Sequence, residues 1–400
     1  MPIAPHIKET MSSKNASAIR KMFEEGSLLK QKYGADNVYD FSIGNPDLEP
    51  PYEVKQTICD VAAGGVFGSH GYMPNAGYVE TRTAMAQKVS KEQNVVLDFS
   101  HVVMSVGAAG ALNCVLKAIL SFGDEVVVPA PFFAEYGHYV RNHGGVLVPV
   151  STKADFSLDT QKIASALTEK TAAVLINSPN NPTGKIYSAY DLSQLSKVLY
   201  DHALSCGRKP YLICDEPYRE IVYTGFDVPP VFPVYDASVV VSSFAKNLSL
   251  PGERIGYIAV NPSCPDANEL ISACIFTTRT LGFVNAPAFF QRVIALSWNS
   301  PTDFSSYEKR RNQLMEILDA ASIEYAEPEG AFYMFCKVPP GKKQDDDGDF
   351  CDHLKKYRIL CAPGAGFGCP GWFRMAYCVP ESTILNSKDV LIRAVADWKG

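Results

Sequence analysis

Two ionisable side chains stand near the ends of short apolar runs in the middle of the chain. Asp215 closes the run YLICD, and Lys246 follows the run SVVVSS after two further residues. A carboxylate at the end of a buried strand is costly unless a cation or donors meet it, and a protonated pyridine nitrogen would meet it. A lysine there either reaches solvent, the usual case, or is desolvated and suited to imine formation. The pair predicts imine chemistry on a heteroaromatic ring, although Asp215 alone fits a salt-bridge role equally well.

Amide and aromatic side chains follow two neighbouring apolar runs. The string SPNNPTG comes after TAAVLI, and its prolines make a rigid turn that fixes the amide of Asn181 as a directed donor. Phe133 follows the run EVVVP and offers a ring for stacking on a flat heteroaromatic ring. A surface turn and a core phenylalanine are the alternative interpretations. Both residues extend the predicted ring-binding site.

Small residues at a predicted strand-to-helix turn favour an anion site. The turn at 106–110 reads VGAAG, and small residues let free backbone N–H groups and the positive helix end approach a phosphate. Simple packing is the more common reason for such a turn when it is taken alone. Ser243 and Arg254, on either side of Lys246, also suit a phosphate. The turn lacks the Gly-Lys-Ser/Thr ending of a Walker motif.

The elements that must position these residues alternate along the chain. The β-branched runs HVVMSV, DEVVVP, TAAVLI, PYLICD and SVVVSS are separated by helical patterns, which is typical of βαβ units and a mostly parallel sheet. Such sheets bind ligands at the carboxyl ends of their strands. An N-terminal helix is predicted over 17–29. From about Phe289 a second domain is expected, with the polar string GKKQDDDGD as a solvated turn rather than a calcium loop.

Composition limits the class of protein and its partners. The 400 residues exceed one compact core, and 46% hydrophobic with 20% charged residues is typical of a globular protein, so two domains are expected. A net charge of -6 with mixed signs offers no basic surface for nucleic acid, which favours a small ligand. No metal site is indicated.

The N-terminus and the apolar stretches argue against secretion and membrane insertion. The start MPIAPHIKETMSSK has no apolar segment after a charged tip, so we expect a cytoplasmic protein. The apolar stretch 102–120 is interrupted by polar residues and is interpreted as buried, not transmembrane. The 11 cysteines show no C-x-x-C spacing and are expected to be reduced.

The combination of SPNNPTG, CDEPY and SFAKNLSLPGERIGY, in this order, resembles the class I and II aminotransferases over nearly the whole chain. This resemblance implies the fold type I of pyridoxal-phosphate (PLP) enzymes, an α/β fold. Its large domain has a mostly parallel sheet flanked by helices, and a smaller α+β domain follows. The expected boundaries are 1–48 for the N-terminal arm and part of the small domain, 49–288 for the large PLP-binding domain and 289–400 for the small C-terminal domain.

The resemblance also implies roles for the cofactor-binding residues. Lys246 would form the Schiff base with PLP and move the proton, Asp215 would pair with the ring nitrogen, and Tyr218 would bind the ring hydroxyl together with Asn181. The phosphate and ring contacts would come from Gly107, Ala108, Ala109, Phe133, Ser243 and Arg254. Tyr72 of HGYMPNAG resembles the tyrosine that reaches the phosphate in the neighbouring subunit, which implies a homodimer.

The resemblance also implies substrate-binding residues in two further segments, and one arginine is a further candidate. Arg374 of GWFRMAYCV resembles the arginine that grips the substrate α-carboxylate in a planar fork, and Gly44 of SIGNPD lines the same pocket. Ala108 and Ala109 offer only backbone at a turn where relatives often carry a hydroxyl or a lysine, which argues against carrying over the recognition of a second carboxylate by that lysine. Arg279, one residue away from the expected spacing before Asn285, is our candidate contact for a dicarboxylic substrate, with a surface role as the alternative.

The implied activity is ping-pong transfer of an amino group between an L-amino acid and a 2-oxo acid. We expect aspartate or broad specificity, with 2-oxoglutarate as acceptor. A C–S β-lyase or an amino-acid decarboxylase of the same fold is the alternative, because loss of either group feeds the same electron sink. A PLP-sensing regulator is disfavoured, because the forty residues ahead of SIGNPD are too few for a winged helix.

Overall fold

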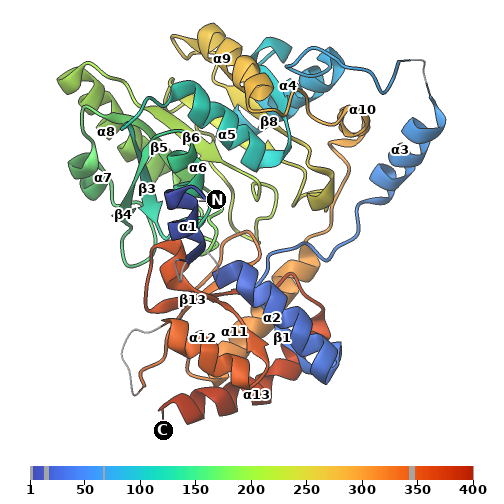
Figure 1. Cartoon of the computed structure of the whole chain (residues 1–400), viewed down its shortest axis with the longest axis vertical. Helices are drawn as coiled ribbons and strands as arrows, with labels where there is room; N and C mark the ends of the chain where they lie inside the picture. Colours follow the sequence, from blue (N-terminus) through green and yellow to red (C-terminus); the bar gives the residue numbers. More distant parts are fainter. Residues whose placement is uncertain (1–2, 13–17, 66–67, 342–346, 400) are drawn as a thin grey trace.

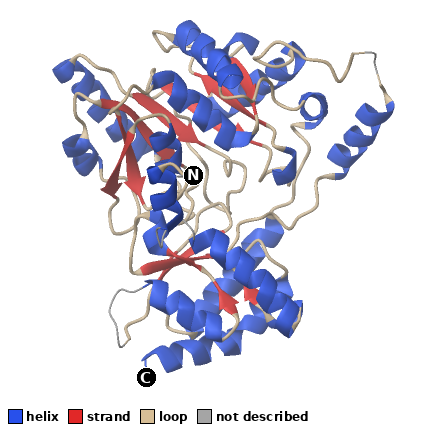
Figure 2. Ribbon diagram, in the orientation of Figure 1, coloured by secondary structure: helices blue, strands red, loops and turns tan. Residues whose placement is uncertain are grey.

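The structure is a computed structural model that describes residues 3–12, 18–65, 68–341 and 347–399. One part is built around a large sheet, and in the other about the C-terminal quarter of the chain packs with an N-terminal helix (Figure 1). Helices surround the strands in both parts (Figure 2).

The large sheet has seven strands in the order β2-β8-β7-β6-β5-β3-β4. β8 runs antiparallel to β2 and β7, and the other pairs are parallel. The central strands are buried along their length, as expected for a parallel sheet covered on both faces. This confirms the predicted sheet. Its strands are β2 (Val102–Ser105), β3 (Glu125–Ala130), β4 (Val146–Ser151), β5 (Thr171–Asn177), β6 (Tyr211–Asp215), β7 (Ser238–Ser243) and β8 (Gly256–Val260).

One helix of the large part, α8, has sequence signals for a helix terminus at both of its ends. α8 begins with a capping box of Ser188 and Asp191 and ends at Gly207, which adopts the left-handed conformation with φ 75°. The helices of this part are α3 (Tyr52–Ala63), α4 (Val79–Gln93), η2 (Phe99–His101), α5 (Gly107–Ile119), α6 (Tyr136–Asn142), α7 (Thr160–Ala166), α8 (Ala189–Cys206), η3 (Pro251–Glu253), α9 (Ala267–Thr280) and α10 (Ala288–Ser297).

Three neighbouring parallel strands end at one edge of the large sheet. β5 ends at Asn177, β6 at Asp215 and β7 at Ser243, and the register pairs Asn177 with Asp215 and Asp215 with Val241. The loops that follow carry SPNNPTG, EPY and the Lys246 segment. The parallel order therefore gathers the three predicted motifs at one edge of the sheet.

The smaller part contains a four-stranded antiparallel sheet in the order β12-β13-β10-β9 and a parallel pair β1-β11. Its strands are β1 (Tyr39–Asp40), β9 (Tyr325–Ala326), β10 (Tyr333–Lys337), β11 (Ile359–Leu360), β12 (Ala362–Pro363) and β13 (Trp372–Ala376). Its helices are α2 (Ala18–Tyr33), η1 (Ala35–Asn37), α11 (Ser305–Ala320), α12 (Asp347–Lys356), η4 (Gly364–Phe367) and α13 (Glu381–Lys399), and α1 (Pro5–Ser12) precedes them.

The predicted domain boundaries remain a proposal that the packing of α10 refines. Two separate apolar clusters form the cores of the two parts, and Val293 and Ile294 of α10 belong to the cluster of the large part. α10 also contacts α3 and α4. We therefore propose that the small domain begins after α10 rather than at residue 289, with β1 contributed from the N-terminal arm.

The polar string GKKQDDDGD is not wholly a solvated turn. Residues 342–346 lie outside the described residues, but Asp347 begins α12 and is buried. Its carboxylate accepts hydrogen bonds from the backbone N–H groups of Ala365 (2.7 Å) and Gly371 (3.2 Å), which ties α12 to the turn before β13. The solvated-turn prediction was wrong here, because a buried carboxylate satisfied by backbone donors cannot be told from a surface acid by composition.

Other expectations can be compared with the described residues. The predicted N-terminal helix corresponds to α2, and residue 17 of the predicted range lies outside the described residues. In the described ranges, no helix is long and apolar enough to cross a membrane. The same ranges contain no cluster of three or more His, Cys, Asp or Glu side chains that could hold a metal ion.

Candidate active site

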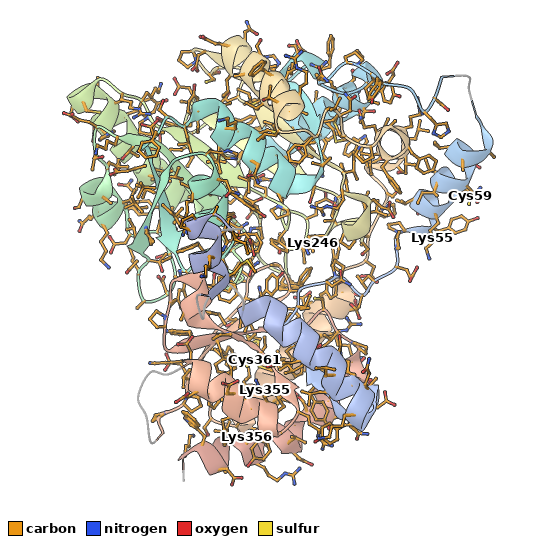
Figure 3. The ribbon with its side chains drawn as sticks, in the orientation of Figure 1. Lys55, Cys59, Lys246, Lys355, Lys356 and Cys361 are labelled. Carbon is orange, nitrogen blue, oxygen red and sulfur yellow. The ribbon has the colours of Figure 1, made fainter. Side chains whose placement is uncertain are left out.

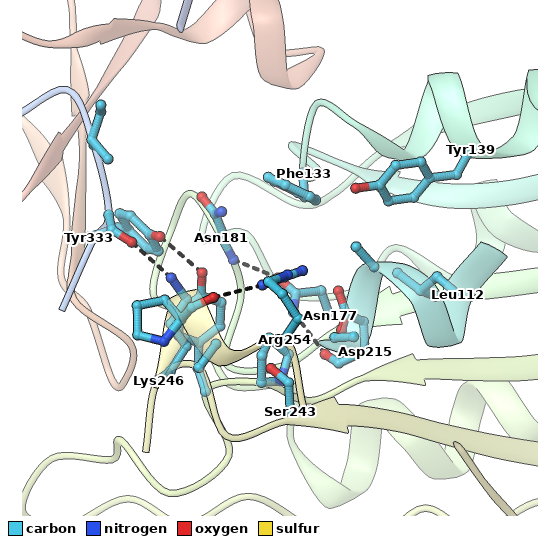
Figure 4. A pocket seen from close by; sticks show the side chains of 18 of the residues that line it. Leu112, Phe133, Tyr139, Asn177, Asn181, Asp215, Ser243, Lys246, Arg254 and Tyr333 are labelled. Atoms are coloured by element: carbon cyan, nitrogen blue, oxygen red, sulfur yellow. Dashed lines mark hydrogen bonds between the residues drawn. The ribbon is translucent and has the colours of Figure 1, made fainter. Parts of the chain in front are cut away.

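A cavity of about 270 Å³ lies between the two parts, at the sheet edge where β5, β6 and β7 end (Figure 4). Lys246 lies at this junction in the view of the whole chain (Figure 3). The large part contributes strand-end residues and the start of α5, and the small part contributes Tyr333 of β10 and Arg374 of β13. The cavity therefore joins residues that are distant in sequence.

Lys246 occupies the centre of the cavity with a partly buried side chain. Its Nζ donates a hydrogen bond to the Gly44 carbonyl oxygen at 2.8 Å. Burial lowers the pKa of Lys246 to about 8, and the positive charges of Arg374 and Arg254 act in the same direction, while Cys378 opposes them. The amine is therefore partly neutral near neutral pH, which a nucleophile and proton carrier requires.

Asp215 is a buried carboxylate with one oxygen left without a partner. Tyr136 donates its hydroxyl to Asp215 Oδ2 at 2.6 Å, whereas Oδ1 has no hydrogen-bond partner. Burial raises the pKa of Asp215 to about 7, because the hydrogen bond from Tyr136 only partly offsets the loss of solvent. A cation at Oδ1 would remove this cost.

A chain of hydrogen bonds links the sheet edge to the small domain. Asn177 donates to the Asp215 carbonyl at 2.8 Å and accepts from the Asn181 N–H at 2.7 Å. Asn181 Oδ1 accepts from one Arg374 terminal nitrogen at 2.9 Å, while the other donates to the Ser42 carbonyl at 2.7 Å. The predicted donor group of Asn181, its Nδ2, is left for a ligand.

Arg374 is almost fully buried, at 3% exposed, yet its Nε has no hydrogen-bond partner. The guanidinium lies over the ring of Tyr333, 4.5 Å from the centroid, and over that of Phe367 at 4.8 Å. Neither ring carries a formal charge that would neutralise the guanidinium. An anion entering the cavity would meet a desolvated cation whose position is already fixed.

The start of α5 provides a cradle for an anion. Gly107 has φ 74°, and no side chain caps the helix, so the backbone N–H groups of its first turn are available. A Cβ at Gly107 would lie 2.9 Å from a terminal nitrogen of Arg254. Ala108, Ala109 and Ser243 line the same end of the cavity. These residues fit a phosphate group.

Two tyrosines and a phenylalanine complete the lining. The hydroxyls of Tyr218 and Tyr333 are 2.9 Å apart, and both side chains are buried. Phe133 faces the cavity from the loop after β3 and packs edge-on against Tyr136, with ring centroids 5.5 Å apart (Figure 4). Gly44 lies beside Tyr333, and a Cβ there would overlap the Tyr333 hydroxyl.

Two predicted residues do not reach this cavity within one chain. Tyr72 is 93% exposed on the loop before α4, and Arg279 is exposed on α9 with its guanidinium over the ring of Phe276. Neither is among the cavity-lining residues. Their predicted roles require a second copy of the chain.

Four lining or supporting residues were missed by the sequence reasoning. Asn177 is the last residue of β5 and could have been found, because it directly precedes SPNNPTG. Tyr136 and Tyr139 follow Phe133 on a short helix, and their spacing of three places them on one face. Tyr333 has no distinguishing sequence signal, since it starts an apolar strand in which aromatic residues are common.

The unpartnered groups of the site fit PLP as the ligand. Asp215 Oδ1 suits a protonated ring nitrogen, the uncapped start of α5 with Arg254 suits a phosphate, and Lys246 suits the aldehyde carbon. The first two matches rest on groups that the protein alone leaves without a partner or without a cap, whereas Lys246 donates to the Gly44 carbonyl.

Comparison with known proteins gives consistent matches. The model of the family described as aminotransferase class I and II matches residues 36–388. A probable aspartate/prephenate aminotransferase of Aquifex aeolicus is 31% identical over 88% of this chain and 89% of its own length. An aminotransferase crystal structure from Eubacterium rectale covers 100% of both chains with 37% identity and a TM-score of 0.94. Aspartate aminotransferase of Thermus thermophilus with maleate covers 98% of this chain and 100% of its own, with 26% identity and a TM-score of 0.86.

Proposed function

The chain belongs to the class I and II aminotransferases and is a PLP-dependent aminotransferase, and we propose that it transfers the amino group of L-aspartate, or of a broader set of L-amino acids, to 2-oxoglutarate. The observation that carries this proposal is that Lys246 and the partly unpartnered Arg374 line one cavity. A fixed cation beside a partly neutral amine suits an α-amino acid, which presents a carboxylate next to the bond that loses a proton.

The residues take separate roles in the proposed reaction. When bound, PLP supplies an electron sink for the pair left at the substrate Cα. Arg374 binds the α-carboxylate in a planar fork, Asn181 donates its Nδ2 into the site, and Asp215 meets the positive ring nitrogen. Lys246 carries the proton away from Cα. Its lowered pKa keeps part of the amine neutral and able to accept that proton.

The proposed specificity for dicarboxylic substrates rests on the names of related proteins and on the positive charges that line the cavity. The Aquifex relative is named an aspartate/prephenate aminotransferase, and the Thermus structure contains maleate, a dicarboxylate. In the described part of this chain, the cations that line the cavity are Lys246, Arg254 and Arg374, and each already has a proposed role. A second substrate carboxylate therefore needs another cation, and we propose Arg279 from a second copy of the chain.

We propose a homodimer because of the loop that carries Tyr72. This loop is fixed to the segment before α10, because Asn75 donates to the Val284 carbonyl at 2.8 Å and Asn285 donates to the Pro74 carbonyl at 3.0 Å. Tyr72 itself projects into solvent. A rigid loop that exposes a large aromatic side chain is suited to insertion into the phosphate end of a neighbouring site.

A matrix of amino donors against oxo-acid acceptors tests the reaction. With purified protein and PLP, we expect aspartate and glutamate to convert the bound cofactor to pyridoxamine phosphate, and 2-oxoglutarate to reverse it. Release of pyruvate and ammonia from a cysteine conjugate without any oxo acid would instead identify the β-lyase. Loss of carbon dioxide would identify the decarboxylase.

Variants test the two contributions proposed for a second copy. Arg279→Ala should raise the KM for aspartate and 2-oxoglutarate about 10-fold or more while sparing monocarboxylic donors, and an unchanged KM contradicts the role. Tyr72→Ala and Lys246→Ala chains, each weak or inactive alone, should regain activity when mixed, because a mixed dimer contains one intact site. No recovery in mixed dimers confirmed by mass spectrometry would refute the shared site.

A further inference from the structure

Tyr333 lies between two ends of the site, the end proposed to bind the substrate carboxylate and the end proposed to bind the cofactor hydroxyl. It is the first residue of β10, and its register partner in the sheet is Ala376 of β13, two residues from Arg374. Its side chain is 2% exposed and lines the cavity on the side of Lys246, opposite Leu112 and Tyr139 (Figure 4). Its ring and its hydroxyl contact different partners.

The ring of Tyr333 supports the Arg374 guanidinium, whose carbon lies 4.5 Å from the ring centroid. A buried guanidinium over an aromatic face is held by the negative potential of that face, and burial strengthens this attraction. The contact complements the hydrogen bonds that Arg374 makes to Asn181 and Ser42. The ring therefore helps to fix the plane of the guanidinium.

The hydroxyl of Tyr333 meets the hydroxyl of Tyr218 at 2.9 Å. Each hydroxyl has a single proton to donate. If Tyr218 donates its proton to the cofactor, as proposed, the proton between the two tyrosines must come from Tyr333. Accepting that hydrogen bond makes Tyr218 a stronger donor, because bonds in a chain polarise one another.

We propose that Tyr333 is a positioning residue that joins the substrate-carboxylate end of the site to the cofactor-hydroxyl end, through its ring on Arg374 and its hydroxyl on Tyr218. This inference rests on the proposed roles of Arg374 and Tyr218. It also explains Gly44, since any side chain there would displace the Tyr333 hydroxyl. Burial raises the pKa of Tyr333 to about 12, so the hydroxyl keeps its proton over the working range of pH.

Tyr333→Phe tests the hydroxyl, because the ring on Arg374 is retained. A weakened Tyr218 hydrogen bond stabilises negative charge on the cofactor hydroxyl less well. The midpoint of the pH titration of the bound cofactor's visible absorption should therefore rise by about 0.5 pH unit or more. We expect kcat/KM to fall about 5-fold, which corresponds to about 1 kcal/mol, with the KM for the amino donor nearly unchanged.

Tyr333→Leu tests the ring, because it removes the support of the guanidinium as well. We expect the KM for the amino donor to rise about 10-fold relative to Tyr333→Phe, since a desolvated cation–π contact is lost. Tyr377→Phe is a matched control. Its hydroxyl pairs with that of Tyr223 at 2.8 Å within the apolar core of the smaller part, outside the cavity, so neither the absorption midpoint nor kcat/KM should move.

The outcomes separate this inference from the proposed function. If wild-type protein fails in the donor and acceptor matrix, the proposed function is wrong. If wild-type protein is active and Tyr333→Phe has the absorption midpoint and kcat/KM of wild type, the coupling is wrong. An equal shift in Tyr377→Phe also overturns it, because the effect would then follow from loss of any buried tyrosine pair.

Discussion

Without the cofactor, Asp215 is a buried carboxyl group whose charge is costly, and Asp215→Asn removes that cost. The side chain is 5% exposed, its Oδ1 is unpartnered, and burial raises its pKa from the usual 3.8 to about 7. Between these two pKa values, the carboxyl group of Asp215 keeps its proton in the folded state but has already lost it in the unfolded state. Stability therefore falls as pH rises from about 4 to 7, and above that range this group adds no further pH dependence.

The magnitude follows from the width of this interval. A full difference of one bound proton changes the free energy of unfolding by about 1.4 kcal/mol per pH unit. Because the folded carboxyl is already half ionised at pH 7, the range from pH 5 to 7 contributes about 2 kcal/mol. Burial also raises the pKa of Glu216 to about 7, but Glu216 is present in both proteins and largely cancels in the comparison. Asn keeps an acceptor for the Tyr136 hydroxyl.

Urea unfolding of cofactor-free protein at pH 5, 6, 7 and 8 measures the effect. We expect the wild type to lose about 2 kcal/mol more than Asp215→Asn between pH 5 and 7. Tyr136→Phe should extend the loss above pH 7, since the hydrogen bond from Tyr136 lowers the pKa of Asp215. Equal pH dependence of wild type and Asp215→Asn would refute the buried, unpaired carboxylate. The same variant should bind PLP more weakly, because the ring nitrogen loses its counter-charge.

Three further predictions follow from the geometry. Arg374→Lys loses the planar fork and should lower kcat/KM about 100-fold, mainly through KM; retained KM in steady-state assays would exclude Arg374 as the carboxylate site. Gly44→Ala places a methyl group on the Tyr333 hydroxyl and should destabilise the protein by about 1–3 kcal/mol in urea unfolding, whereas Gly65→Ala, at a position with open space and no left-handed φ, should have little effect. Lys246→Ala should abolish turnover and the visible absorption band of bound PLP, and persistence of both would disprove the central role of Lys246.

The sequence determined the sheet and the chemistry at its edge. β-branched runs alternating with helices predict parallel strands, and parallel strands must end at a common edge, so Asn181, Asp215 and Lys246 were predicted to lie together before any coordinates. The polar residue types at those strand ends predicted imine chemistry on a heteroaromatic ring, because buried charge requires a partner, and the resemblance to the class I and II aminotransferases implied that the ring is PLP. The order of strands and motifs along the chain was sufficient to predict this part of the site.

Only the tertiary structure decided how the small domain completes the site. Arg374 meets Asn181 across 193 positions, and Tyr333 bridges Arg374 and Tyr218 without any local signal. Such contacts depend on how the two parts of the chain pack against each other, and residue spacing along the chain does not determine that packing. The same reasoning explains Asp347, whose burial comes from the turn before β13. The roles proposed for Tyr72 and Arg279 require contact with a second copy of the chain, because neither residue lines the cavity of its own chain.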